Sequence, residues 1–331
     1  MVFLSIVQRD GTKFLREWHK MEKYRDIHRL SPPIRLKINR VGVKDVKKQI
    51  TREFNGNLEI LNVKINAYID IPATLKGAHI SRNLEAINEI IEETIRGKTT
   101  SIEDFCAELA KKLLEKHEYA SNSEVTVEAE YPVEKNTPAT NLPTQQMYII
   151  HAGALVWKEK EKVEVKKWIG IETEGLTVCP CAQELVKNYV KQKLLNMNLR
   201  ENLVNAIVEA IPIASHLQRG KALLLVYIRE HEKIDLKDLI EIVELSFSSP
   251  IFDLLKRPDE QQLIINAYKN SKFAEDVVRT MLKNFLEKYG DKLSDDTLLI
   301  AQQESYESIH GHNVYAERVL TLKELKEEVN G

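Results

Sequence analysis

The stretch LNVKINAYIDIP (residues 61–72) is followed closely by KGAHISRNLEAINEIIEETIRG (residues 76–97), and the two together indicate the fold. Every second residue from Val63 to Ile71 is apolar, which is the period of a strand with one buried face. In the second stretch apolar residues recur at steps of three and four, at Ile80, Leu84, Ile87, Ile91 and Ile95. This spacing predicts an amphipathic helix that ends near Gly97. A strand that leads into a helix is therefore the first unit of the chain.

The same kinds of element continue outward from this unit. A second helix is expected from Ile102 to Leu114, capped at Thr100 or Ser101, with strands over 123–133, 147–157 and 162–172. The later part repeats the order, with a strand over 221–230, helices over 234–247 and 273–285, and a strand over 297–310. Strand, helix, helix, strand thus occurs twice. This predicts an internal duplication in an α+β fold, with helix pairs covering antiparallel sheets.

A short signature accompanies each helix pair. GAHISR (residues 77–82) and ASHLQR (residues 214–219) share the pattern of a histidine, any residue, serine or glutamine, and arginine. Because the signature stands beside the helix pair in both halves of the chain, it supports the internal duplication. We therefore predict a basic leader at residues 1–33, a first module at 34–180, a helical insert at 181–212 and a second module at 213–331.

The composition excludes several classes of protein. The 331 residues carry 48 basic and 50 acidic side chains, a net charge of -2, and residues 1–52 alone carry 14 basic and 5 acidic ones. No apolar run approaches the ~18–20 residues of a membrane span, and three cysteines cannot form a disulfide framework. We expect a soluble cytoplasmic protein. We interpret the basic stretch as a solvated face rather than an RNA-binding surface, because it lacks aromatic residues at a base-stacking spacing.

The sequence Cys179-Pro180-Cys181 follows an apolar strand and opens a helical stretch. A thiol at a helix N-terminus is a better metal ligand or nucleophile than one inside a helix. The competing interpretation is that both sulfurs are small core groups, as we expect for Cys106 on the apolar face of its helix.

The histidines fall into two groups. A position at an element boundary, beside small or polar residues, is shared by His79, His216, His310 and His312. A surface position among charged residues is expected for His19, His28, His117 and His231. His310 and His312 would lie on one side of an extended strand. One thiolate, one or two imidazoles and a carboxylate would make a mononuclear metal site with an open position for water.

The densest polar stretch between apolar helices is SPIFDLLKRPDEQ (residues 249–261) with NSKFAEDVVR (residues 270–279). A turn that contains a proline carries Lys256, Arg257, Asp259 and Glu260. Glu275 follows after a further stretch about as long as one helix. One interpretation is a salt-bridged helix cap. The other is a site where cations meet phosphate and a carboxylate accepts paired N–H bonds from guanine. The sequence contains neither a P-loop nor a Rossmann glycine motif.

Six stretches together resemble the type IB GTP cyclohydrolase family, and in particular its archaeal branch: KGAHISR, TVCPCAQ, SHLQRG, SPIFDLLKRPDEQ, NSKFAEDVVR and ESIHGHNVYAER. The resemblance covers most of the chain. It implies the tunnelling fold, in which tandem sheet and helix-pair units assemble into oligomeric barrels with active sites between subunits. It also implies hydrolytic opening of the imidazole ring of GTP, with carbon 8 of guanine leaving as formate.

The resemblance also implies particular roles. In the archaeal branch the metal would be ferrous iron, with manganese or zinc as other candidates, and the product 7,8-dihydroneopterin 2',3'-cyclic phosphate. The metal ligands carried over by motif are Cys179, His216, Glu260 and His310, with His312 as the alternate. Glu275 would anchor guanine, and Cys181 would handle protons near carbon 8, so that the catalytic residues are Cys179, Cys181 and His216. Ribose and phosphate contacts are implied for His79, Ser81, Arg82, Gln218, Arg219, Lys256 and Arg257.

The expected partners are GTP as substrate and further copies of the chain, as a homodimer or higher homo-oligomer, without membrane or nucleic acid. Two other functions stay open. A folate-type cyclohydrolase would release dihydroneopterin triphosphate, and a non-catalytic pterin- or nucleotide-binding protein of the same fold would bind GTP without metal or formate. The insert over residues 182–210 departs from the pattern of the family. It separates the two cysteines from SHLQR by more residues than the compact bacterial sequences do.

Overall fold

One continuous antiparallel sheet organises the chain. The computed structural model describes residues 26–54, 57–95, 101–160 and 162–330. The strand order is β1-β2-β3-β4-β5-β6-β8-β9, with the short β7 paired to β5. The first half consists of a short 3-10 helix η1 (Ile27–Arg29), strands β1 (Ile38–Phe54) and β2 (Asn57–Ile71), helices α2 (Ser81–Ile95) and α3 (Ile102–Lys116), and strands β3 (Asn122–Asn136) and β4 (Pro143–Glu159).

The second half repeats this order with additions. Its elements are β5 (Lys162–Val178), α4 (Pro180–Asn196), α5 (Glu201–Ala210), β6 (Leu217–Arg229), α6 (Leu236–Ser246), β7 (Ser249–Pro250), α7 (Arg257–Lys269), α8 (Ala274–Tyr289), β8 (Leu298–Ser305), β9 (Val314–Thr321) and α9 (Leu322–Asn330). Each half thus has two strands, a helix pair and two strands, so the predicted recurrence of elements is confirmed. The module boundary at residue 180 stays a prediction, because the sheet runs without a break from β4 through β6.

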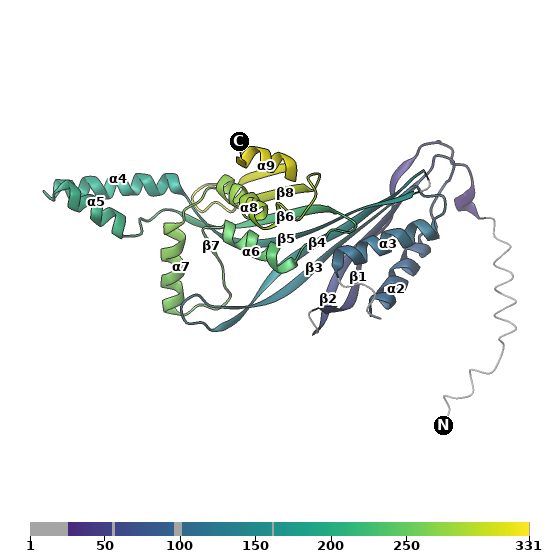
Figure 1. The fold of residues 1–331 in the computed structure, drawn as a ribbon, viewed down its shortest axis with the longest axis horizontal. Coiled ribbons are helices and arrows are strands. Elements are labelled where there is room, and N and C mark those ends of the chain that lie inside the picture. Colours follow the sequence, from purple (N-terminus) through teal and green to yellow (C-terminus); the bar gives the residue numbers. More distant parts are fainter. Residues whose placement is uncertain (1–25, 55–56, 96–100, 161, 331) are drawn as a thin grey trace, which may run out of the picture.

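The core lies on one face of this sheet. Directly paired residues of antiparallel strands point to the same face. A single row of such pairs crosses seven strands and is buried throughout: Ile65, Val127, Ala152, Ile169, Val226, Leu299 and Leu320. The same apolar cluster includes Phe105 of α3, Val243 of α6 and Phe285 of α8. These helices therefore cover the buried face of the sheet (Figure 1). The alternating apolar residues from Val63 to Ile71 are the side chains of β2 that point to this buried face.

Three local expectations can be compared with the structure. Ser101 caps α3 as predicted, since its Oγ accepts a hydrogen bond from the Asp104 backbone N–H at 3.2 Å. Leu84 was expected on the buried face of α2, but 42% of it is exposed. The expected stop at Gly97 lies outside the described residues.

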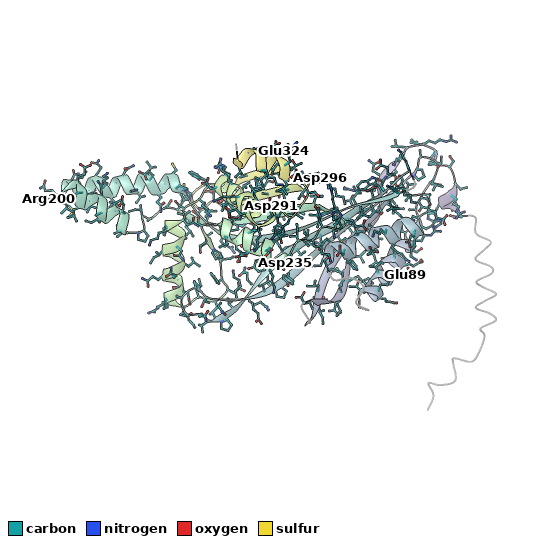
Figure 2. All side chains as sticks on the ribbon, in the orientation of Figure 1. Glu89, Arg200, Asp235, Asp291, Asp296 and Glu324 are labelled. Atoms are coloured by element: carbon teal, nitrogen blue, oxygen red, sulfur yellow. The ribbon has the colours of Figure 1, made fainter. Side chains whose placement is uncertain are left out.

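Helices α4 and α5 form a hairpin that projects from one end of the sheet (Figure 1), with Arg200 at its far tip (Figure 2). The segment for which a helical insert was predicted contains these two helices. Its base is narrow, because Val178 pairs with Leu217 and the Cys179 backbone N–H donates to the His216 carbonyl at 3.2 Å. The hairpin is therefore an enlarged β5–β6 turn. Within the described ranges, no helix has the length and apolar character needed to cross a membrane.

Candidate active site

A pocket of about 290 Å³ lies at the base of the hairpin, where segments distant in sequence meet. Its walls come from the end of β5, the start of β6, the first turn of α8 and the chain that follows β8. The residues that line it are Thr177, Cys179, His216, Gln218, Lys272, Phe273, Ala274, Glu275, Ser305, Glu307, His310, His312 and Val314. Six predicted site residues therefore meet here: Cys179, His216, Gln218, Glu275, His310 and His312.

Cys179 is placed by the junction between a strand and a helix. It is the N-cap of α4, and its Sγ accepts a weak hydrogen bond from the Ala182 backbone N–H at 3.4 Å. Pro180 fits the first helical turn, where no backbone N–H donor is needed. Ser215 Oγ donates to the Cys179 carbonyl at 2.6 Å, which ties the cysteine to the segment that carries His216 into β6.

His216 is held by a chain of two side chains. Glu307 can only accept hydrogen bonds as a carboxylate, so the Gln218 amide N–H donates to its Oε1, at 3.1 Å. The Gln218 carbonyl oxygen then faces His216 Nδ1 at 2.9 Å, which requires a proton on Nδ1. The other ring nitrogen, Nε2, is left free to bind a metal. Glu307 is well buried, with 7% of its side chain exposed, and its Oε2 lies 3.7 Å from Nδ1.

His310 and His312 lie in the loop between β8 and β9. The prediction that they share an extended strand is wrong, because β8 ends at Ser305. The chain leaves the sheet there, and the Tyr306 backbone N–H donates to the Arg219 carbonyl. The two rings nevertheless stack, with centroids 5.3 Å apart, and the His310 ring stands edge-on to His216 at 6.2 Å. All three imidazoles therefore face one pocket.

Another part of the pocket wall carries a carboxylate and an ammonium group. Glu275 lies in the first turn of α8. Lys272 precedes it, and its Nζ donates to the carbonyls of Leu245, Ser246 and Phe247 at the end of α6. Burial lowers the pKa of Lys272, although Asp276 opposes that shift. Lys272 thus fastens the start of α8 to α6 and fixes where Glu275 stands.

The structure places the other predicted residues outside this pocket. Cys181 is exposed on α4, and Glu260 and Arg257 are exposed on α7 with Lys256 at its N-cap. Arg219 faces Glu174 at 3.1 Å. The remaining three lie in the first half, with His79 just before α2 and with Ser81 and Arg82 in its first turn.

The buried carboxylate of the RPDE stretch is Asp259, not Glu260. Its Oδ1 accepts from the Ala139 and Thr140 backbone N–H groups, and its Oδ2 accepts from Thr140 Oγ1 and the Lys256 backbone N–H. Desolvation opposes the charge, but these hydrogen bonds outweigh it and hold the pKa of Asp259 well below its usual range. Asp259 therefore anchors the N-terminus of α7 to the loop between β3 and β4.

The donors in the pocket match a transition metal in type. A thiol, three imidazoles and the carboxylates of Glu275 and Glu307 suit iron, zinc or manganese. Within the described part of the chain, however, no three of these donor atoms lie within 4.8 Å of one another. The ligand spacing is therefore not preformed in the single chain.

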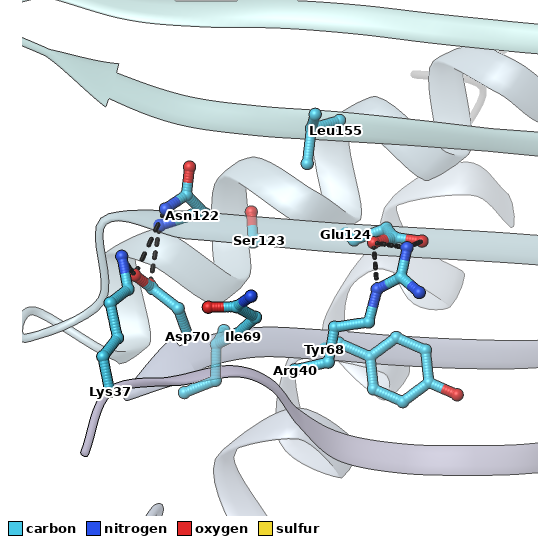
Figure 3. A pocket seen from close by; sticks show the side chains of 10 residues that line it. Lys37, Arg40, Tyr68, Ile69, Asp70, Asn122, Ser123, Glu124 and Leu155 are labelled. Atoms are coloured by element: carbon cyan, nitrogen blue, oxygen red, sulfur yellow. Dashed lines mark hydrogen bonds and ion pairs between the residues drawn. The ribbon is translucent and has the colours of Figure 1, made fainter. Parts of the chain in front are cut away.

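A second hollow, of about 440 Å³, lies on the first half (Figure 3). Its charges are paired: Lys37 lies 2.9 Å from Asp70, and Arg40 lies 2.7 Å from Glu124. Desolvation opposes the Asp70 charge, but hydrogen bonds from Ser121, Lys37 and Asn122 hold the pKa of Asp70 well below its usual range. These satisfied groups stabilise the strands and leave the first pocket as the better candidate for chemistry.

Sequence reasoning missed Glu307 and Lys272. Glu307 begins the ESIHGH stretch that supplied His310, so the motif itself contained the signal. Lys272 stands three residues before Glu275 in NSKFAED. Nothing local in the sequence indicates that its ammonium group points back onto another helix.

The architecture is similar to that of uricase from Arthrobacter globiformis, with a TM-score of 0.50 over 86% of this chain and 93% of that chain. The sequence identity is 8%, so the likeness concerns the fold alone. The chain has the tunnelling fold, as its sequence predicted. The fold and the pocket together define a tunnelling-fold enzyme with a thiol, imidazole and carboxylate site.

A family model described as type I GTP cyclohydrolase folE2 matches residues 24–316, and the chain belongs to this family of GTP cyclohydrolases. It is similar to GTP cyclohydrolase MptA of Methanobrevibacter smithii, with 42% identity over 300 residues, which is 90% of this chain and 96% of that one. It is also similar to GTP cyclohydrolase MptA of Methanosphaera stadtmanae, with 41% identity over 311 residues, covering 93% and 98%.

Proposed function

We propose that the enzyme opens the imidazole ring of GTP, releases carbon 8 as formate and forms 7,8-dihydroneopterin 2',3'-cyclic phosphate, the first step of methanopterin-type pterin synthesis. The observation that carries the proposal is the meeting of Cys179, His216, His310 and Glu275 in one pocket. The high similarity to archaeal proteins named MptA supports the choice of product. The three unpaired cysteines are consistent with a reducing cytoplasm.

We assign a divalent metal, ferrous iron in the first place, to Cys179, His216 and His310, with His312 as the alternate ligand. Such an ion, when bound, lowers the pKa of a water molecule to about 7 and so supplies hydroxide at neutral pH. Gln218 and Glu307 keep His216 in the tautomer that presents Nε2. The second imidazole of the stacked pair is then free to carry protons to and from the opening ring.

Glu275 is assigned to guanine. The base presents two adjacent N–H groups, the ring amide and the exocyclic amine, and a carboxylate can accept both at once. Because Lys272 fixes the first turn of α8, Glu275 is held in the wall of the pocket that the histidines also line. A base bound there would direct its imidazole ring toward His216 and His310.

We infer that the active site is completed by another subunit. Glu260, Lys256, Arg257 and the exposed thiol of Cys181 lie outside the pocket of their own chain, as do His79, Ser81 and Arg82. The hairpin also exposes large apolar side chains, with 68% of Leu185, 63% of Tyr189 and 70% of Met197 accessible to solvent. Such surfaces favour association. In an oligomer Glu260 would supply the missing carboxylate ligand, and Lys256, Arg257 and Arg82 would supply cations for the triphosphate.

The test is an anaerobic incubation of the purified protein with GTP and ferrous iron, with and without chelator, followed by product mass and formate assay. The cyclic phosphate, lost with chelator, is expected. A triphosphate product would instead assign the enzyme to the folate-type branch. GTP binding without turnover under every metal would refute the proposal and favour a binding protein. Cys179→Ala is expected to lose activity, whereas His231→Asn, at an exposed histidine far from the motif residues, serves as the matched control.

A further inference from the structure

A second group of metal-ligand side chains lies on the first half of the chain. It consists of Asp26, which precedes η1, His28 within η1, and His79 just before α2. One ligand atom from each can be chosen so that all three lie within 4.8 Å of one another, and no other such group occurs among the described residues. In Figure 1, η1 and α4 lie at opposite ends of the molecule, so this group is separate from the pocket at Cys179.

The distances within the group suit coordination. Two ligands of a tetrahedral ion with metal–ligand bonds of about 2.0–2.1 Å lie roughly 3.3–3.4 Å apart. Each imidazole nitrogen lies at this spacing from one of the two carboxylate oxygens: His28 Nδ1 is 3.3 Å from Asp26 Oδ1, and His79 Nε2 is 3.3 Å from Asp26 Oδ2. The two imidazole centroids are 4.5 Å apart with their planes tilted by 46°. The rings thus converge on the carboxylate rather than stacking flat.

Backbone contacts hold the two segments together without any ion. The Lys76 backbone N–H lies within hydrogen-bonding distance of the His28 and Leu30 carbonyls, at 3.1 and 2.9 Å, and the Gly77 N–H donates to the His28 carbonyl at 3.3 Å. A Cβ at position 77 would lie 3.1 Å from His28 Cδ2, so glycine permits this close approach. Asp26 is fixed in turn, because its Oδ1 accepts from the His28 backbone N–H. The three donors are therefore positioned by the fold itself.

The charges around the group leave room for a cation, although the Arg29 guanidinium competes with it for the Asp26 carboxylate. Arg29 Nε lies 3.3 Å from Asp26 Oδ2, and 74% of the Arg29 side chain is exposed, so it can swing away. Arg82 is held elsewhere by the Lys116 carbonyl at 2.8 Å.

We propose that Asp26, His28 and His79 bind one divalent transition-metal ion, such as zinc or cobalt, independently of the metal in the pocket. Two imidazoles and a carboxylate are ligands that such ions accept, with the remaining positions open to water because the site is partly exposed. The ion cross-links η1 to the loop before α2. In this role His79 serves the metal through Nε2 rather than a substrate phosphate.

The test counts zinc ions per subunit in the full-length protein, by equilibrium dialysis and elemental analysis. We compare wild type, Cys179→Ala, His28→Gln and the double variant, with His231→Gln as a control for histidine content. His28→Gln is expected to lose one ion relative to wild type, and the double variant one ion relative to Cys179→Ala. His231→Gln should lose none. Equal stoichiometry in wild type and His28→Gln would overturn the proposal, whatever the pocket binds.

Two further readouts keep a folding defect from being mistaken for a lost site. Half of the His28 side chain is solvent-exposed, so the metal-free thermal midpoint of His28→Gln should equal that of wild type. Zinc should raise the midpoint of Cys179→Ala but not that of the double variant. In the cobalt form, the sulfur-to-metal absorption of the pocket should persist in His28→Gln. Its loss there would show that the two sites are not independent and would refute the proposal.

Discussion

Replacement of Glu307 tests whether the chain from Glu307 through Gln218 to His216 governs the pocket. Glu307→Ala removes the acceptor of the Gln218 amide, which donates to it at 3.1 Å, in a place where only 7% of the carboxylate side chain is exposed. Gln218 is then free to turn, and His216 loses the partner that fixes its Nδ1 proton. A hydrogen bond to a charged group contributes about 1.5–3 kcal/mol. At about 1.4 kcal/mol per tenfold change, metal affinity should fall about 10- to 100-fold.

The assay is competition for ferrous iron or zinc against a chromophoric chelator, together with turnover of GTP at saturating metal. Glu307→Gln retains an acceptor oxygen and should lose less than Glu307→Ala. Glu304→Gln is the matched control, because this carboxylate lies three residues earlier, in β8, and pairs with Asn313 outside the pocket. Wild-type metal affinity and turnover in Glu307→Ala would refute the orienting role.

Three further predictions follow from the same structure. Glu275→Gln should raise KM for GTP about tenfold or more while metal content stays at the wild-type level, because one carboxylate acceptor for guanine becomes an amide; kinetics with metal analysis check this. Gly175→Ala should lower the free energy of unfolding by about 1–3 kcal/mol in urea titrations, since its Cβ would lie 2.3 Å from the Phe247 ring. Burial lowers the pKa of His117 from 6.5 to about 4, so the unfolded chain binds more protons than the folded one between these pH values. Stability should therefore be full above pH 6.5 and fall by about 2 kcal/mol toward pH 4, after allowance for screening, and His117→Gln should flatten this slope in acid titrations.

Much of the fold could be predicted because burial on one face leaves a plain period in the sequence. The helix residues Phe105, Cys106 and Leu109 were expected on the apolar side of α3, and all are buried. Strand β1 was not predicted as an element. Its register shifts between Val43 and Val46, where Asp45 has a positive φ of 57°, and this bulge breaks the alternation that identifies a strand.

The sequence predicted those residues of the candidate site that belong to recognisable motifs. The short stretches identified Cys179, His216 and His310, which do share a pocket. They could not show that the chain ahead of His310 leaves the sheet, nor that Glu260 lies on an exposed helix while Asp259 is buried beside it. His117 was expected at the surface among charged neighbours and is instead fully buried, with its ring between Asn83 and Tyr119. These are tertiary facts, since each depends on a partner far along the chain.

The hairpin of α4 and α5 joins the body at a junction closed by the pairing of Val178 with Leu217 and by the Cys179–His216 backbone hydrogen bond. The spacing between the thiol and the imidazole is therefore independent of how much chain is spliced between them. A lineage can add or remove helical turns there without changing that spacing. For the experimenter, the tip at Arg200 is the natural position at which to graft a fluorophore or a reporter domain onto a working enzyme.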